Sequence, residues 1–324
     1  MCSRRRMREY LPFFVGCWLM AVGRYTWAFF SVPGNVVKRW NAFSVLFLSC
    51  FSLILVIFAQ NFSILMKKQL NLKVENLKKI TEQHILLSLV APNGDMPEIK
   101  AGQFVEVKVD NAPTVFLRRP ISVHFVDYAK QRLDLLVALV GDGTRKMATL
   151  SVGDEVSVLL PLGNGFPMPT KAGAKCLLVG GGVGIAPLLY LGDRLKAAGH
   201  QVSFLLGTRN AGGVMLENEF KKFGSLYLTT EDGSVGEKGF VTNHSILEKE
   251  QFDEIFVCGP TPMMKAVAKY AYAKNIECYV SLENKMACGL GACLCCVTED
   301  NKGHNRCVCS EGPVFNINEL PWQN

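Results

Sequence analysis

Four cysteines near the C-terminus limit what this chain can fold into more than any other feature. Cys288, Cys293 and Cys296 have the spacing C-x4-C-x2-C, and Cys309 follows as a distant fourth thiol. This spacing is typical of a plant-type [2Fe–2S] cluster, which four cysteine thiolates hold. Small residues between the first two cysteines let the backbone wrap a cluster and direct amide groups at its sulfides. The spacing therefore predicts an iron–sulfur protein that transfers electrons.

A tetrahedral zinc site is the main alternative for these cysteines. Zinc ribbons usually pair two C-x2-C knuckles, whereas one knuckle here is widened to a glycine-rich C-x4-C. A disulfide framework is disfavoured because most of the chain has the pattern of a large α/β protein with its own core. Cys295 and Cys307 are surplus, since the first breaks the x2 spacing and the second lies outside the run 308–313. Cys176 and Cys258 lie in apolar strand-like runs and are predicted to be packed core thiols.

The positive charge of the chain is concentrated at its N-terminus. Residues 1–65 contain seven basic residues and one acidic residue, which is +6 of the formal net charge of +7. Residues 66–324 are therefore close to neutral, and the sequence does not indicate a nucleic-acid-binding surface.

The N-terminal extension, residues 1–65, is hydrophobic as well as basic. Residues 41–66 contain no charged side chain and are long enough to cross a bilayer once. We expect either a membrane anchor over residues 42–66 or a stretch that precedes a natural start at Met66. The protein is expected in the cytoplasm, with membrane association only through this extension.

Residues 66–170 have the pattern of a β-rich domain. The run from Phe104 to Val109 alternates with period two, and turn signals such as Gly141-Asp142-Gly143 separate the apolar runs. Short strands with regular turns predict a small antiparallel barrel. The expected strands lie at 72–74, 85–90, 104–109, 133–140 and 155–160.

Residues 171–280 have a different pattern, in which strands alternate with helices. Expected strands lie at 176–179, 202–206, 225–229 and 254–258, and expected helices at 188–198 and 217–223. This alternation predicts a Rossmann-like α/β domain with a parallel sheet. The cysteine module occupies residues 281–324. The predicted fold is thus a β-barrel, an α/β nucleotide domain and a small C-terminal [2Fe–2S] module.

A glycine-rich turn follows the first strand of the α/β domain. Glycines at a strand-to-helix turn let the backbone approach a phosphate, and the helix N-terminus adds amides and a positive dipole. The sequence departs from G-x-G-x-x-G and instead resembles the pyridine-nucleotide lobe of the ferredoxin–NADP reductase superfamily. In that superfamily a Cys-Gly-Pro motif lies on the nicotinamide side. The residues implied for the nucleotide are Gly180, Gly182, Gly184, Gly259 and Pro260, with Cys258 near the nicotinamide.

The barrel contains a motif that resembles the flavin motif of the same superfamily. In Arg119-Pro120-Ile121-Ser122 the resemblance assigns the arginine to the FAD pyrophosphate and the serine to flavin N5. A basic strand end before a proline turn is the alternative interpretation. Gly143 and Thr144 would offer an amide and a hydroxyl to an FAD phosphate. The backbone of Leu136-Val137-Ala138 would lie beside the flavin.

The order of barrel, nucleotide lobe and cysteine module resembles one family, the electron-transfer subunits of two-subunit, NAD-linked dihydroorotate dehydrogenases. The resemblance covers roughly residues 68–320 and implies Cys288, Cys293, Cys296 and Cys309 as cluster ligands. Its most specific pieces are residues 119–122, 161–166, 180–187, 230–234, 263–264, 286–289 and 309–315. One departure is Val137-Ala138, where the family often has an aromatic and a basic residue.

The resemblance implies a concrete chemistry. A partner subunit with FMN would oxidise dihydroorotate in pyrimidine biosynthesis, and the two subunits would form a heterotetramer with two copies of each. Electrons would then pass through the cluster and FAD of this chain to NAD+.

Related flavin proteins are the main rivals. The small subunits of NAD(P)H:ferredoxin and sulfide oxidoreductases have a similar order of parts, but often use aspartate as the first cluster ligand, where this chain has Cys288. NADH and NADPH are not distinguished by the residues alone, because Thr208-Arg209-Asn210 contains no acid for the ribose hydroxyls. The family favours NAD.

Overall fold

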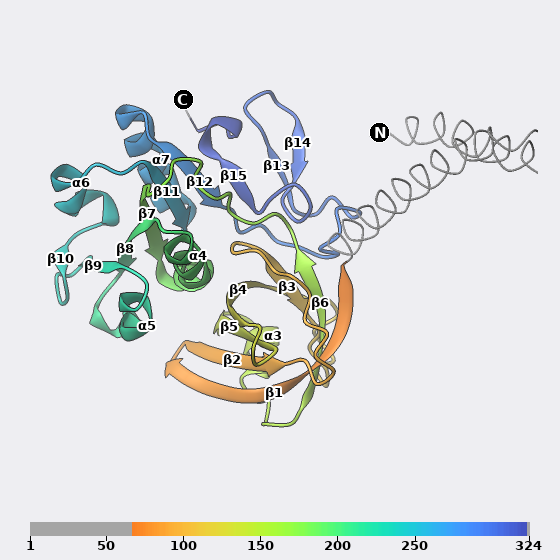
Figure 1. The fold of residues 1–324 in the computed structure, drawn as a ribbon. Helices are drawn as coiled ribbons and strands as arrows, with labels where there is room; N and C mark the ends of the chain where they lie inside the picture. Colours follow the sequence, from red (N-terminus) through yellow and green to blue (C-terminus); the bar gives the residue numbers. More distant parts are fainter. Residues whose placement is uncertain (1–66, 323–324) are drawn as a thin grey trace, which may run out of the picture. The chain divides into compact units, whose positions relative to one another are not determined.

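A closed barrel forms the first part of the computed structural model, which describes residues 67–322 (Figure 1). Its strands pair antiparallel in the order β1-β2-β5-β4-β3-β6. This confirms the predicted barrel. The strands are β1 (Lys68–Thr81), β2 (His84–Val90), β3 (Phe104–Val107), β4 (Arg119–Asp127), β5 (Arg132–Ala138) and β6 (Glu155–Leu162), and a short helix, α3 (Asp142–Met147), follows β5.

The pleat of the strands explains which side chains fill the barrel. In β6 the residues Val156, Val158, Leu160 and Leu162 are buried and the residues between them are more exposed, as a period of two requires. All four residues of β3 are buried. Val105 and Val107 fill the barrel, whereas Phe104 and Glu106 lie on the outer face of β3, beneath the C-terminal module.

A seven-stranded sheet follows, in the order β10-β9-β8-β7-β11-β12-β15 (Figure 1). Its strands are parallel except β15, which pairs antiparallel with β12 at one edge. The predicted parallel sheet is therefore confirmed. The strands are β7 (Lys175–Gly181), β8 (Gln201–Thr208), β9 (Ser225–Thr230), β10 (Glu237–Lys238), β11 (Glu254–Cys258), β12 (Glu277–Ser281) and β15 (Val314–Asn316).

The helices of this domain connect its parallel strands. The turn after β7 is a single 3-10 turn, η1 (Gly182–Ile185), which runs directly into α4. The remaining elements are α4 (Ala186–Ala197), η2 (Ala211–Gly213), α5 (Glu217–Lys221), η3 (Val241–Asn243), α6 (Ile246–Lys249) and α7 (Thr261–Lys274). The expected helices at 188–198 and 217–223 correspond to α4 and α5.

Helix α4 packs between its own sheet and the barrel. The hydroxyl of Tyr190 donates a hydrogen bond to the carbonyl oxygen of Ile99 in the barrel, at 3.2 Å. The ring of Tyr190 also meets the ring of Phe125 on β4 edge to face, with centroids 5.6 Å apart. Both rings are apolar surfaces that water would otherwise cover, so this contact ties the barrel to the nucleotide lobe.

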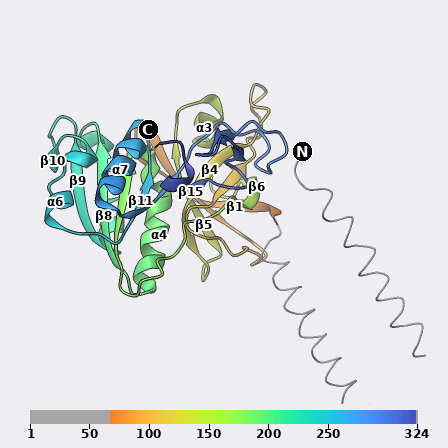
Figure 2. The ribbon, with the colours of Figure 1, turned by 90° about the horizontal axis from the view of Figure 1, so that it is seen from above.

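The C-terminal module is bound to both preceding parts (Figure 2). Its hairpin, β13 (Val297–Glu299) with β14 (Asn305–Cys307), is followed by β15 and η4 (Ile317–Glu319). The amide of Asn164, after β6, donates to the carbonyl oxygen of Gly312 at 2.6 Å. The Arg306 guanidinium lies within ion-pair distance of Asp300, Glu311 and Glu319.

No helix within residues 67–322 is long and apolar enough to cross a membrane. The predicted anchor at residues 42–66 lies outside the described residues.

A carboxyl group at the amino end of β11, an inner strand of the sheet, yields a prediction about pH. Glu254 on β11 is paired with Glu277 on β12. Burial, and then the charges of Glu277 and Asp253, raise the pKa of Glu254 to about 6 from its ordinary value of 4.5. The folded protein thus holds a proton that the unfolded chain releases. The free energy of unfolding should therefore fall as pH rises from about 4.5 to 6, and stay lowered above that range.

We predict that Glu254→Gln stabilises the protein at pH 8 by about 1 kcal/mol, after allowance for the partial exposure of the group. At pH 4 the substitution should have little effect, because the carboxyl is then protonated in both states. Urea unfolding at the two pH values measures this. Glu248→Gln, an exposed position on α6, is the control, and an equal gain in both variants would contradict the prediction.

Candidate functional site

The four predicted cluster cysteines come together as two pairs. The loop between β12 and β13 holds Cys288, Cys293 and Cys296, and Cys309 follows β14. The thiols of Cys288 and Cys293 are hydrogen-bond partners, and so are those of Cys296 and Cys309. Cys296 and Cys309 are buried, whereas Cys293 is exposed and Cys288 is partly exposed. The site therefore opens to the surface on the side of the first pair.

Backbone amides point at three of the four sulfurs. The amide of Leu290 donates to Cys288 Sγ at 3.3 Å, and that of Gly291 donates to Cys309 Sγ at 3.1 Å. The amide of Cys309 donates to Cys296 Sγ, also at 3.3 Å. Amide hydrogen bonds to sulfur stabilise the thiolate form and tune the potential of a bound cluster.

The two pairs differ in the acidity of their thiols. Burial alone would raise the pKa of Cys288, but the amide of Leu290 and further hydrogen bonds from Cys293 and Ala292 lower it to about 6. Burial, followed by the hydrogen bond with Cys296, raises the pKa of Cys309 to about 12. Metals bind the thiolate form. The lowered pKa of Cys288 favours its thiolate at neutral pH, whereas Cys309 must lose a proton when a metal binds.

This donor set fits a two-iron cluster better than a single zinc ion. The four thiols lie as two pairs, Cys288 with Cys293 and Cys296 with Cys309. A tetrahedral zinc site needs four such ligands at one ion, whereas each iron of a [2Fe–2S] cluster needs two protein thiolates. Of the two surplus cysteines, Cys295 is exposed and Cys307 is buried.

A buried carboxyl group beneath the cluster loop was not predicted from the sequence. Glu106 on β3 is 1% exposed, and neither of its oxygens has a hydrogen-bond partner. Burial, opposed by the charge of Arg118 and reinforced by Cys288, raises the pKa of Glu106 to about 7. The group lies directly under Gly289, where an added Cβ would be 2.9 Å from Glu106 Cγ. Alternation along 104–109 identified the strand but could not show that its outer face is covered.

Gly289 offers a test of how the cluster loop is held. Its φ of +63° disfavours a side chain, and a Cβ there would also meet Leu162 at 3.1 Å. Gly303, in the turn between β13 and β14, has a similar φ of +78°, but its nearest neighbour is 3.6 Å away.

We predict that Gly289→Ala lowers the iron content of the purified protein at least two-fold, because the loop must move away from β3. Gly303→Ala carries the same kind of backbone strain, about 1 kcal/mol, and should keep its full iron content. Iron and sulfide analysis measures both. Equal iron in the two variants would show that the loop position does not matter for cluster binding.

Arg119 of the flavin motif and Arg118, the residue before it, have different surroundings. The Arg118 guanidinium donates to the carbonyl oxygens of Ser157 and Glu106, at 2.8 and 3.3 Å, and so ties β4 to its neighbours. Arg119 instead reaches the N-terminus of α3, where a Cβ on Gly143 would lie 2.5 Å from Arg119 Nε. The structure thus brings together Arg119 and Gly143, the two residues predicted to bind the phosphates of FAD.

Thr144 has a local partner that the sequence did not indicate. Its hydroxyl accepts from the amide of Gly141 at 3.1 Å and donates to the carbonyl oxygen of Gly141 at 3.0 Å. The hydroxyl therefore caps the first turn of α3. To bind an FAD phosphate as predicted, it would have to share or give up its hydrogen bonds with Gly141.

The other predicted flavin residues lie on neighbouring strands. Pro120, Ile121 and Ser122 are half-buried on β4 and pair with β3. On β5, Leu136 and Val137 are buried and Ala138 is half-buried. The side chain of Val137 is buried in the barrel wall, and that of Ala138 on the opposite face of β5 is short. A contact of these residues with a flavin through the backbone stays a prediction.

The nucleotide turn and the Cys-Gly-Pro motif are in contact. β7 and β11 pair in parallel, with Gly180 opposite Cys258. A Cβ on Gly184 would lie 2.5 Å from the carbonyl oxygen of Cys258, and one on Gly181 would be 3.0 Å from Pro260 Cδ. Gly182 has a φ of +56°. Only glycines allow the two strand ends to approach this closely.

Cys258 is not an activated thiol. It is 8% exposed, and burial, followed by the charge of Glu283, raises its pKa to about 12. The thiol is therefore protonated at neutral pH and would meet a nicotinamide as a neutral group.

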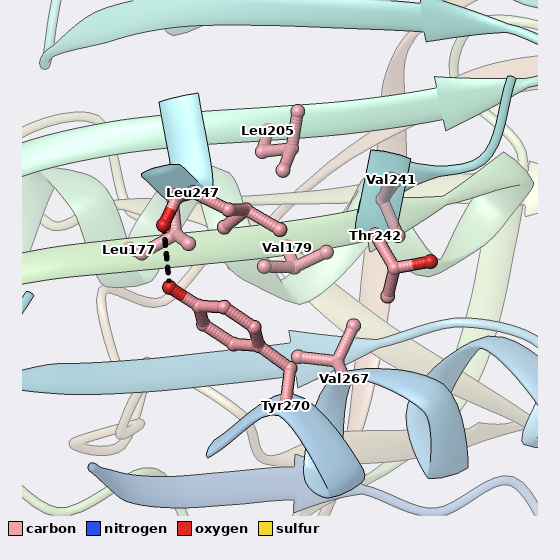
Figure 3. Close-up of a pocket in the computed structure, with 8 residues that line it drawn as sticks. All are labelled: Leu177, Val179, Leu205, Val241, Thr242, Leu247, Val267 and Tyr270. Atoms are coloured by element: carbon pink, nitrogen blue, oxygen red, sulfur yellow. Dashed lines mark hydrogen bonds between the residues drawn. The ribbon is translucent and has the colours of Figure 1, made fainter. Parts of the chain in front are cut away.

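An apolar gap between β7, β8 and α7 lies apart from these residues (Figure 3). Figure 3 shows Tyr270 donating a hydrogen bond to the carbonyl oxygen of Leu247, at 2.8 Å. The gap is too narrow for a water molecule and is lined by none of the predicted site residues. It is a packing feature of the core.

Two segments of the chain match known domain families. Residues 283–321 match the iron–sulfur cluster binding domain of dihydroorotate dehydrogenase B. Residues 178–269 match an oxidoreductase NAD-binding domain. The first segment contains all four predicted cluster ligands, and the second contains both predicted nucleotide motifs.

Curated relatives extend the likeness over most of the described residues. The electron transfer subunit of dihydroorotate dehydrogenase B (NAD(+)) from Shouchella clausii is 43% identical over 224 residues, which are 68% of this chain and 85% of the relative. This chain belongs to that family. The subunit from a Bacillus cereus strain is 41% identical over 263 residues, 79% of this chain and 99% of the relative. The family resemblance predicted from the sequence is therefore confirmed.

Solved structures show the same architecture. A structure of an NADH-dependent reduced ferredoxin-NADP oxidoreductase is 30% identical, with a TM-score of 0.70, and the match covers 78% of this chain and 90% of that one. The cytochrome b5 reductase domain of Ulva prolifera nitrate reductase is 18% identical, with a TM-score of 0.54, and covers 65% of this chain and 94% of that one. The second likeness concerns the fold alone.

Proposed function

We propose that this chain passes electrons from a dihydroorotate-oxidising partner to NAD+. The observation that carries the proposal is the arrangement of Cys288 with Cys293 and Cys296 with Cys309, in a segment that matches the iron–sulfur domain of this enzyme. When bound, the cluster accepts single electrons and FAD converts them to the hydride that NAD+ requires.

The residues of the chain then have distinct tasks. Residues 66–170 hold FAD, residues 171–280 hold NAD and residues 281–324 hold the cluster. Arg119 places its charge at the FAD pyrophosphate, and Ser122 lies at the flavin ring. The turn after β7 binds the NAD pyrophosphate through its amides and the N-terminus of α4.

The partner follows from the same assignment. It is an FMN-containing catalytic subunit, present as two copies with two copies of this chain, in the pyrimidine biosynthesis of the cytoplasm. The relatives are named as electron transfer subunits, which supports the need for a catalytic subunit.

Replacement of one ligand tests the electron route. Cys288→Ser should lose iron and the visible absorption of the cluster but keep FAD, because the thiol and the flavin motif lie in different parts of the fold. NADH should still reduce the flavin, while electron transfer from the partner to NAD+ falls at least 100-fold. The matched control is Cys295→Ser, which changes an exposed surplus thiol in the same loop and should retain cluster and activity. Normal coupling in Cys288→Ser would refute the ligand assignment.

The likeness to the ferredoxin-NADP oxidoreductase structure supports a second candidate, a subunit that exchanges electrons with ferredoxin. Anaerobic purification of the full chain from its own cells, with identification of the bound protein, separates the two. A bound FMN protein that reduces NAD+ with dihydroorotate supports the first function. A complex that reacts with ferredoxin and not with dihydroorotate supports the second.

A further inference from the structure

A buried histidine connects two elements of the predicted binding sites. One is β4, called here the flavin strand because it carries the predicted flavin motif, and the other is the glycine turn after β7, called here the nucleotide turn. His124 on β4 is 2% exposed, and its Nδ1 lies 2.8 Å from the carbonyl oxygen of Ala186. Ala186 is the first residue of α4 and directly follows the glycine turn η1. None of the sequence motifs includes His124, and the proposed function gives it no task.

The position of His124 results from a local irregularity in the barrel. Between β4 and β5, Val123 pairs with Leu135 but Phe125 pairs with Asp134, so His124 is one extra residue on β4. Such a β-bulge redirects a side chain out of the regular pleat. Here it directs the imidazole out of the barrel wall and onto α4, two positions after Ser122 of the flavin motif.

The chemistry of this contact is fixed by the acceptor. A carbonyl oxygen only accepts, so Nδ1 of His124 carries the hydrogen and donates it. Burial lowers the pKa of His124, against the opposing effects of the Ala186 bond and the charges of Asp134 and Glu219. The imidazole is therefore neutral at pH 7. Its hydrogen bond to Ala186 uses the hydrogen that Nδ1 carries in the neutral ring, so the bond does not require a second proton on the ring.

We infer that His124 is a positioning residue, which holds the nucleotide turn at a set distance from the flavin strand. This inference rests on the proposed function. Amides of the turn would bind the NAD pyrophosphate, so a shift of the turn moves the nicotinamide relative to the flavin. Shifts of about 1 Å are enough to slow a positioned reaction by about 100-fold.

A second contact at the same interface provides a control. Tyr190 lies one helical turn after Ala186 on α4, and it donates to Ile99 of the barrel at 3.2 Å. It joins the same two parts of the fold, but its hydroxyl does not touch the glycine turn. Loss of that bond should weaken the interface without moving the nucleotide.

The experiment measures reduction of FAD by NADH in the holoprotein by stopped-flow absorbance. His124→Asn keeps an amide N–H near the position of Nδ1, whereas His124→Gln places its N–H one bond farther out and His124→Leu has none. We expect the limiting rate constant to fall at least ten-fold in His124→Leu and His124→Gln. It should stay within two-fold of the unaltered protein in His124→Asn and Tyr190→Phe.

The outcomes separate the inference from the proposed function. If NADH does not reduce the flavin of the unaltered protein, the proposed function fails first. If the unaltered protein reacts and His124→Gln reacts within two-fold of it, the positioning role is wrong. A fall in Tyr190→Phe as large as that in His124→Gln would also overturn it, because the effect would then be general loosening of the interface. If His124→Leu does not fold, the pair His124→Asn and His124→Gln decides.

Discussion

The cysteine site depends on one short antiparallel pairing, that of β15 with β12. Ser281 pairs with Val314 and Val280 with Phe315, so the chain leaves the sheet and returns to it on neighbouring strands. Closing a long loop without such an anchor costs conformational entropy that a cluster alone would have to offset. The pairing brings Cys309 back toward the loop of the other three cysteines.

The same sheet explains why three binding features lie close together. β7, β11 and β12 are adjacent and parallel. Their carboxyl ends therefore meet at one edge, from which the glycine turn, the Cys-Gly-Pro motif and the cluster loop emerge in that order. Ligands of open α/β sheets bind at such an edge. The barrel packs β4 against α4 and β3 beneath Gly289 of the cysteine loop, so both strands lie close to this edge.

The contact of the cluster loop with the barrel has an electrostatic cost. Glu106 is enclosed between β3 and Gly289 with no hydrogen-bond partner for either carboxyl oxygen. A buried carboxylate without a partner is unfavourable, and burial accordingly raises the pKa of Glu106 to about 7, so that the carboxyl binds a proton more readily than an exposed one. A change of charge on the nearby thiols acts on the same carboxyl, since Cys288 contributes to this shift.

Local signals in the sequence determined most of the architecture. Period-two alternation and turn residues predicted the barrel, and the strand–helix alternation predicted the parallel sheet, because both patterns reflect burial of one face of each element. The spacing of the cysteines along the chain predicted the ligand set, since a plant-type cluster is held by four thiolates, three of which lie close together in the sequence. These features are local, and so a single sequence contains them.

Other features depended on contacts between distant segments and were decided only by the tertiary structure. The β-bulge that turns His124 toward Ala186 and the cover that buries Glu106 beneath Gly289 leave no periodic signal. Register and layer packing set each of them, and a shift of one residue in a strand changes which face a side chain occupies. The sequence thus determined which groups this protein contains for electron transfer, whereas the packing of barrel, sheet and loop decided how they face one another.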